Sequence, residues 1–84
     1  MQQEEIDQII FDLLGRVAPE APLGQLQARL PFRKQFQFDS VDFLKFILGL
    51  EEKIGIKISE LDYPALAGLD GCRAYLASID AGEE

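Results

Sequence analysis

The feature that most constrains the fold of this chain is the spacing of its apolar residues. In several stretches they recur every three to four positions, which is the spacing of one face of an α-helix. The chain has 84 residues, enough for one domain with one hydrophobic core. We therefore expect a single all-α domain over residues 1–84, built from three main helices and one short helix.

The first helix is expected from Gln3 to Val17, and a long loop from Ala18 to Phe38 follows it. A structureless loop of this length is unusual in a compact domain. We therefore expect its apolar residues to pack over the helices and to order it, with its leucines forming one or two helical turns. These apolar residues are Leu23, Leu26, Leu30, Phe32, Phe36 and Phe38.

The second main helix is expected from about Ser40 to Ile54. Asp39 is placed to cap its N-terminus, Asp42 completes a capping box, and Gly55 follows its last turn. One apolar face is expected from Val41, Leu44, Ile47, Leu48 and Ile54, and it is widened by Phe43, Phe46 and Leu50. A helix that is apolar nearly all round is either central or in contact with a partner.

A short third helical segment is expected to open at the capping pattern Ser59–Asp62, with Pro64 limiting its length. The last helix carries apolar residues at helical spacing, namely Leu69, Cys72, Leu76 and Ile79. Cys72 is expected to be a core residue, and Tyr63 and Tyr75 are expected to have packing roles.

The net charge of −7 disfavours nucleic acid as a partner, because a phosphate-binding face needs a basic patch. It favours a protein partner with a basic surface. We expect no membrane insertion, since no apolar run approaches the ~20 residues that span a bilayer. A single cysteine and the absence of a secretory signal favour the cytoplasm. With no His and one Cys, we expect no metal site.

Ser40 lies between the carboxylates of Asp39 and Asp42, where a polar loop gives way to the second helix. A serine without a neighbouring base is a poor nucleophile, so we do not expect the chain to be an enzyme. On its local pattern alone, Ser40 could be a helix-capping residue. It could also be an exposed acceptor that another enzyme modifies.

The run Asp39-Ser40-Val41-Asp42 resembles the acyl carrier protein family, which has Asp-Ser-Leu-Asp or a close variant at the start of its second helix. The resemblance covers nearly the whole chain and is strongest from Asp39 to Leu76. It implies an acyl-carrier-like bundle in which Ser40 bears 4′-phosphopantetheine, with Asp39, Val41 and Asp42 completing the cofactor-binding motif. A phosphopantetheinyl transferase would attach this group from coenzyme A.

The resemblance further implies that the protein carries an acyl group as a thioester. It would work as a monomer with acyl-loading and acyl-transfer enzymes of fatty-acid, polyketide or related lipid synthesis. A cavity between the helices would shelter the chain. The partner-binding residues would lie on the second helix, at Asp42, Phe43, Lys45, Leu48, Glu51 and Glu52.

This chain departs from the family in ways that favour a specialised carrier. Lys45 stands where the family often has an acidic residue, and Phe43 is apolar at a position expected to be exposed. One alternative is a carrier of D-alanyl, peptidyl or other aminoacyl groups with the same serine chemistry. Another is an unmodified helical interaction module, with Phe43, Phe46 and Leu48 as its binding face and Ser40 only a cap.

Overall fold

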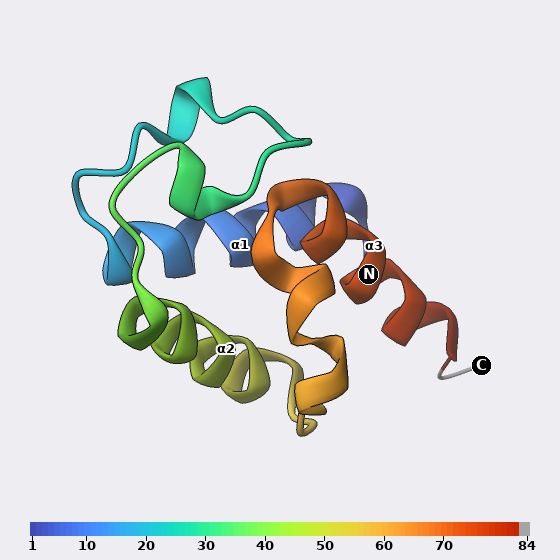
Figure 1. The fold of residues 1–84 in the computed structure, drawn as a ribbon. Coiled ribbons are helices and arrows are strands. Elements are labelled where there is room, and N and C mark those ends of the chain that lie inside the picture. The colour runs from blue at the N-terminus through green and yellow to red at the C-terminus, as the bar shows by residue number, and fades with distance from the viewer. Residues whose placement is uncertain (83–84) are drawn as a thin grey trace.

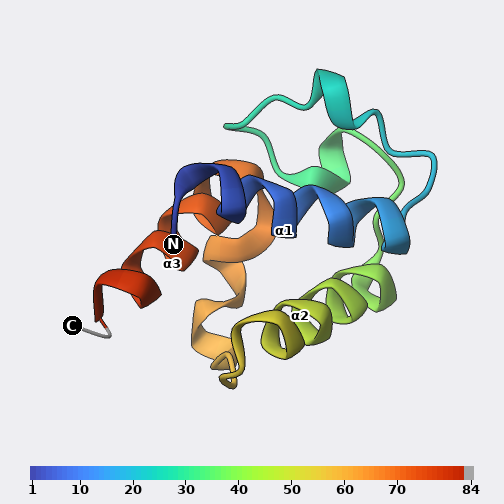
Figure 2. The ribbon, with the colours of Figure 1, turned by 180° about the vertical axis from the view of Figure 1, so that it is seen from behind.

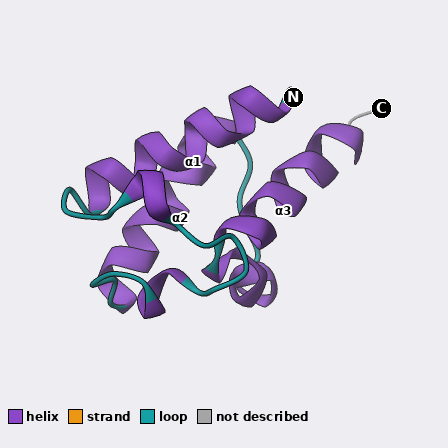
Figure 3. Cartoon of the chain, turned by 90° about the horizontal axis from the view of Figure 1, so that it is seen from above, coloured by secondary structure: helices purple, strands orange, loops and turns teal. Residues whose placement is uncertain are grey.

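The computed structural model describes residues 1–82, and these residues form an all-helical bundle without strands (Figures 1 and 3). The α-helices are α1 (Gln3–Val17), α2 (Ser40–Ile54) and α3 (Leu69–Gly82). The 3₁₀ helices are η1 (Leu23–Gln25), η2 (Phe32–Lys34) and the longer η3 (Glu60–Ala67). The expected all-α fold of three main helices and one short helix is therefore confirmed, with η3 as the short one.

Helix α1 packs against both α2 and α3 and crosses the back of the molecule (Figure 2). It buries Ile6, Ile10, Leu13 and Leu14, which recur at the spacing of one helix face. Asp7 on its edge forms a two-pronged ion pair with Arg73 of α3, with Nε to Oδ1 at 2.7 Å and Nη2 to Oδ2 at 3.1 Å. This hydrogen-bonded pair raises the pKa of Arg73 and ties the first helix to the last.

The loop from Ala18 to Phe38 is held by polar as well as apolar contacts. The Gln35 amide accepts from the backbone N–H of Gln27 at 2.6 Å and donates to the carbonyls of Gln27 and Leu30, both at 2.9 Å. An isolated bridge between Pro31 and Gly68 fastens the loop to the residue before α3.

Phe32 and Phe38 are buried, and Leu23, Leu26 and Phe36 pack partly buried against the core, so the expected apolar ordering is confirmed for them. The expectation for Leu30 is wrong, because its side chain is exposed. A helical turn does begin at Leu23, but the second turn forms at η2, beyond the leucines.

Helix η3 opens where the sequence predicts, with the Ser59 hydroxyl accepting from the N–H of Leu61 at 3.2 Å. Pro64 lies inside η3 and does not end it, which corrects the expectation. The fixed φ of proline is close to that of a 3₁₀ turn, so the helix continues to Ala67. None of the helices in residues 1–82 is long and apolar enough to span a membrane.

Candidate functional site

The N-terminus of α2 is capped by Asp39. Its carboxylate accepts from the N–H of Asp42 at 2.9 Å, and the Asp42 carboxylate accepts from the N–H of Asp39 at 3.3 Å. The predicted capping box is therefore present. Ser40 is the first residue of the helix and Asp39 makes the cap, so the expectation that Ser40 itself caps the helix is wrong, whereas its modification stays a prediction.

The Ser40 side chain is exposed, and its hydroxyl has no hydrogen-bond partner among residues 1–82. It stands at the first turn of a 15-residue helix, where free N–H groups favour a nearby anion. The carboxylates of Asp39 and Asp42 oppose that anion, although each is already engaged by a backbone N–H. Ser40 can therefore act as an accessible acceptor without loss of the helix cap.

Phe38 holds the chain immediately before this site. Its ring is buried and meets Phe32 edge-on at 5.6 Å and Phe46 at 6.2 Å between ring centroids. Phe46 lies on α2 and Phe32 on η2, so Phe38 packs against the helix that Ser40 begins as well as against the loop. This packing fixes the position from which Asp39 caps α2 and from which Ser40 faces solvent.

The outer face of α2 carries three exposed apolar side chains in one stripe. Val41 is 59% exposed, Leu44 47% and Leu48 55%. Lys45 and Glu52 are exposed at helical spacing within the same stripe. Of these residues, Lys45, Leu48 and Glu52 are expected partner contacts, and Val41 is expected in the attachment motif. Leu44 is expected only on the apolar face of the helix. We call these five residues the outer stripe.

Three other expected contact residues have intramolecular partners. Asp42 belongs to the capping box, and Glu51 accepts from the N–H of Ile58 at 2.7 Å. Phe43 is half-buried and meets Phe38 at 6.3 Å and Tyr63 at 5.8 Å between ring centroids, so the expectation that it is exposed is wrong. Their contact roles stay predictions, but each side chain first serves the fold.

The inner face of α2 also differs from the expected one. Phe46, Ile47 and Leu50 are fully buried, whereas Val41, Leu44 and Leu48, expected beside Ile47, point outward. The sequence of α2 is apolar on both sides of the helix, so the spacing of its apolar residues could not show which side is buried. No sequence signal distinguished the face that meets α1.

A groove of about 370 Å³ lies between α2 and η3. Its walls are mostly apolar, with one cationic and one anionic side chain among the lining residues Arg33, Phe43, Glu60, Tyr63, Pro64 and Ala67. Phe43 follows Ser40 by three residues, so the groove begins about one helical turn beyond the hydroxyl. We call this hollow the α2–η3 groove.

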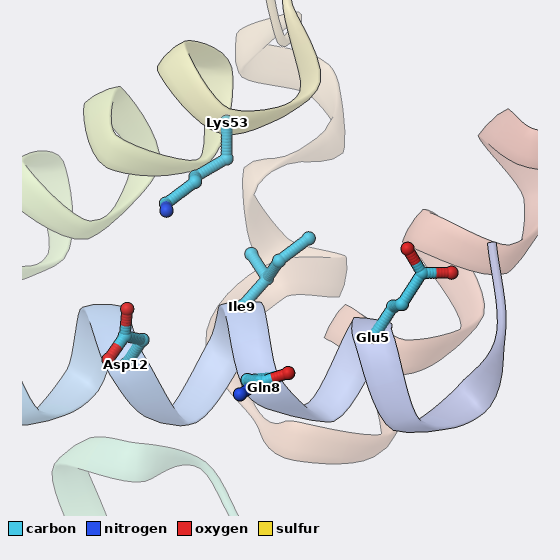
Figure 4. Close-up of a pocket in the computed structure, with 5 residues that line it drawn as sticks. All are labelled: Glu5, Gln8, Ile9, Asp12 and Lys53. Carbon is cyan, nitrogen blue, oxygen red and sulfur yellow. The ribbon is translucent and has the colours of Figure 1, made fainter.

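A second hollow, of about 320 Å³, lies between α1 and the far end of α2 (Figure 4). Lys53 extends from α2 over Ile9 of α1, with the carboxylates of Glu5 and Asp12 on either side (Figure 4). Lys53 is 13 residues after Ser40 along the helix, which corresponds to roughly 20 Å of axis. This hollow is therefore remote from the candidate attachment site.

Cys72 is fully buried, and its thiol donates to the carbonyl of Leu66 at 3.4 Å. Burial raises the pKa of the thiol to about 12, so the thiolate does not form near neutral pH. Its expected role as a core residue is confirmed. Tyr75 is partly buried, and burial together with nearby Asp62 raises its pKa as well.

Sequence reasoning missed the ion pair of Asp7 with Arg73 and the clasp made by Gln35, because both join residues whose proximity only the fold creates. Within residues 1–82, no group of three or more Cys, Asp or Glu side chains is placed to hold a metal ion. The chemistry that the site offers is therefore carried by an exposed serine beside an apolar groove and an exposed apolar stripe. A comparison with protein-family models finds none that matches this chain.

Proposed function

We propose that this protein is an acyl carrier protein, with Ser40 as the attachment point of 4′-phosphopantetheine. The observation that carries the proposal is the free, exposed hydroxyl of Ser40 in the run Asp39-Ser40-Val41-Asp42, with the helix cap supplied by Asp39 instead. A serine that served only to cap the helix would have its hydroxyl engaged by the backbone. This one is available to an external enzyme.

The residues around Ser40 suit a phosphodiester. The exposed hydroxyl oxygen would form the new bond to phosphorus, its proton would pass to the modifying enzyme, and the nucleotide part of coenzyme A would leave. The first N–H groups of α2 would lie close to the attached phosphate. When bound, the group supplies a thiol that can hold an acyl chain as a thioester.

The outer stripe is the proposed docking face for the transferase and for acyl-loading and acyl-transfer enzymes. Exposed apolar side chains at Val41, Leu44 and Leu48 supply area to bury, and Lys45 and Glu52 supply charges of both signs. The mixed charge supports a specialised carrier over a general fatty-acid carrier. We further propose that the protein is a monomer and that it works in the cytoplasm, where coenzyme A and such enzymes are available.

Intact-mass measurement tests this function. The protein is incubated with coenzyme A and a phosphopantetheinyl transferase, and wild type should gain the mass of one phosphopantetheine group. Ser40→Ala should gain none while its helix content stays the same, because Asp39 retains the cap. Ser78→Ala, at an exposed position on α3, is the matched control and should be modified normally. Mass gain by Ser40→Ala, or no gain by wild type, would contradict the proposal.

The specialised role has its own test. Lys45→Glu should improve acyl transfer to the loaded protein by standard fatty-acid elongation enzymes, because it makes the outer stripe more acidic. Ordinary elongation rates with the wild-type protein would show that it is a general carrier. If the attached group is aminoacyl, loading assays with amino acids will show it at the same serine.

The outer stripe also favours a second candidate, an unmodified interaction module. The binding face expected for such a module is wrong for Phe46, which is fully buried, and Phe43 is half-buried. Leu48 is exposed, and with Val41 and Leu44 it forms an exposed apolar face that needs no prosthetic group to bind a protein. In that case Ser40→Ala would keep full partner binding and wild type would stay unmodified. The mass experiment therefore separates the two candidates directly.

A further inference from the structure

A series of aromatic rings runs from the surface of the α2–η3 groove into the core. Tyr63 meets Phe43 at 5.8 Å, and Phe43 meets Phe38 at 6.3 Å between ring centroids. Phe38 in turn meets Phe32 at 5.6 Å and Phe46 at 6.2 Å. Phe32 and Phe46 are fully buried. The space behind the groove is therefore occupied by rings along the whole path.

The contact between Phe43 and Tyr63 joins α2 to η3 across the floor of the groove. The two rings meet edge to face with an angle of 76° between their planes, an arrangement that aromatic pairs favour. Both side chains are half-buried, with one side toward the groove and the other toward the core. An apolar chain moving inward from the groove would have to displace one of them.

The groove outside this pair is small and apolar. Its volume of about 370 Å³ is near the lower end of the range of ligand pockets, roughly 300–1,000 Å³. Pro64 and Ala67 complete its apolar lining, and the charged Arg33 and Glu60 also border it. Because Ser40 lies about one helical turn from Phe43, this groove lies within reach of a group tethered to Ser40.

We infer that Phe43 and Tyr63 form a stopper that keeps cargo attached to Ser40 in the α2–η3 groove, outside the core, and so restricts this carrier to short acyl groups. The inference rests on the proposed function. It departs from the expectation that a cavity between the helices shelters the chain. In this protein the contact between the rings of Phe43 and Tyr63 joins α2 to η3 and closes the way into the core. The part of a longer acyl chain that extends beyond the groove would therefore remain in water.

The test compares cargo lengths on Ser40. Wild-type protein is loaded with acetyl- or octanoyl-phosphopantetheine, and thermal unfolding and thioester hydrolysis are measured. The two forms should unfold within about 1 °C of each other and hydrolyse at similar rates, because the groove is open to solvent and the stopper keeps the added methylenes out of the core. Phe43→Ala and Tyr63→Ala should make octanoyl the more stabilising cargo, by up to about four-fold in the folding equilibrium constant per methylene buried.

Leu61→Ala is the matched control, since Leu61 belongs to η3 but is 90% exposed and does not line the groove. It should leave the length response of wild type unchanged. Where Phe43→Ala proves too unstable to load, Phe43→Leu with Tyr63 intact gives the smaller opening. Wild type that already protects octanoyl better than acetyl would overturn the stopper. The stopper would also be overturned if the Phe43 and Tyr63 variants were stabilised no more by octanoyl than by acetyl cargo.

A second measurement needs no modification of Ser40. Free octanoate is titrated into the unloaded wild type and the Phe43→Ala/Tyr63→Ala double variant by calorimetry. Engineered apolar cavities accept apolar ligands, so the double variant should bind octanoate at least about tenfold more tightly. Equal affinity would reject the stopper even if Ser40 is modified. Tighter binding by the double variant would show that the two rings close the core to apolar chains even if Ser40 is never modified, so failure of the stopper and failure of the proposed function are distinguished.

Discussion

The two faces of α2 both carry large apolar side chains, but their environments are opposite. Phe46, Ile47 and Leu50 on the inner face are fully buried against the rest of the bundle, whereas Leu44 and Leu48 on the outer stripe are about half exposed. Hydrophobicity alone therefore does not place a residue in the core of this helix. The neighbouring element decides which residues are buried: α1 packs along one face of α2, and no element among residues 1–82 covers the other face.

Two adjacent acids on the same helix show the same division. Glu51 is half-buried and accepts from the backbone of Ile58, so it fixes the chain that leaves α2. Glu52, one residue and about 100° further round the helix, is exposed and belongs to the outer stripe. Position around the axis separates side chains that hold the fold from side chains that remain available to a partner.

The largest effect should come from the matched leucines Leu50 and Leu48. Leu50→Ala removes a fully buried side chain and should lower the free energy of unfolding by about 2–5 kcal/mol. Leu48→Ala should change it by less than about 0.5 kcal/mol and should instead slow modification by the transferase. Urea unfolding and mass-detected modification rates measure both. Equal destabilisation by the two variants would reverse the assignment of the faces.

The loop gives the next largest effect. Phe36 is half-buried against Phe32 and Phe38, at 5.9 and 5.4 Å between ring centroids. Phe36→Ala should therefore lower the free energy of unfolding by about 1–3 kcal/mol. A fully buried ring would cost about 3–5 kcal/mol. Phe38→Ala should slow modification of Ser40 more than it lowers helix content. Amide exchange provides the check, because fast exchange throughout the loop in wild type would show that the ring contacts do not order it.

The two adjacent glutamates, Glu51 and Glu52, should show a smaller difference in their contributions to the free energy of unfolding. Glu51→Gln weakens a charge-assisted hydrogen bond to the Ile58 N–H and should cost about 1–2 kcal/mol. Glu52→Gln should leave the unfolding free energy unchanged within about 0.5 kcal/mol. Chemical denaturation at neutral pH measures both variants. A stability loss confined to Glu52→Gln would mean that Glu51 does not secure the exit from α2.

The smallest effect at neutral pH comes from the Cys72 thiol, whose contribution to stability changes only in alkaline solution. Burial raises the pKa of the Cys72 thiol from 9.0 to about 12, so the folded protein holds this proton more tightly than the unfolded chain. The resulting stability is fully present below pH 9 and is lost as the pH rises from about 9 to about 12, by at most about tenfold in the unfolding equilibrium per pH unit. Tyr75, whose pKa is also raised, contributes with the same sign.

Cys72→Ala lacks the titrating thiol, so its unfolding free energy should fall less steeply with pH over this range. Denaturation curves collected at a series of pH values compare the two slopes. Identical slopes for the variant and wild type would show that the thiol does not contribute to the alkaline loss of stability.

Local sequence signals predicted the elements of this fold well. The bounds of α1 and α2 match their expected residues, and the capping box of Asp39 with Asp42 and the left-handed Gly55 at the end of α2 are present. These features depend on residues three or four apart, whose interactions are complete within one helical turn. For the same reason the exposed position of Ser40 at the start of α2 could be predicted from sequence.

Only the tertiary structure decided which apolar face of α2 is the core, that Phe43 packs against Tyr63 and that Glu51 secures Ile58. It also decided that Leu30 is exposed while Phe32 is fully buried. Each of these outcomes depends on elements distant in the chain coming together. The physical reason is that burial depends on which surfaces meet, and a helix with two apolar faces does not itself specify which face will meet α1.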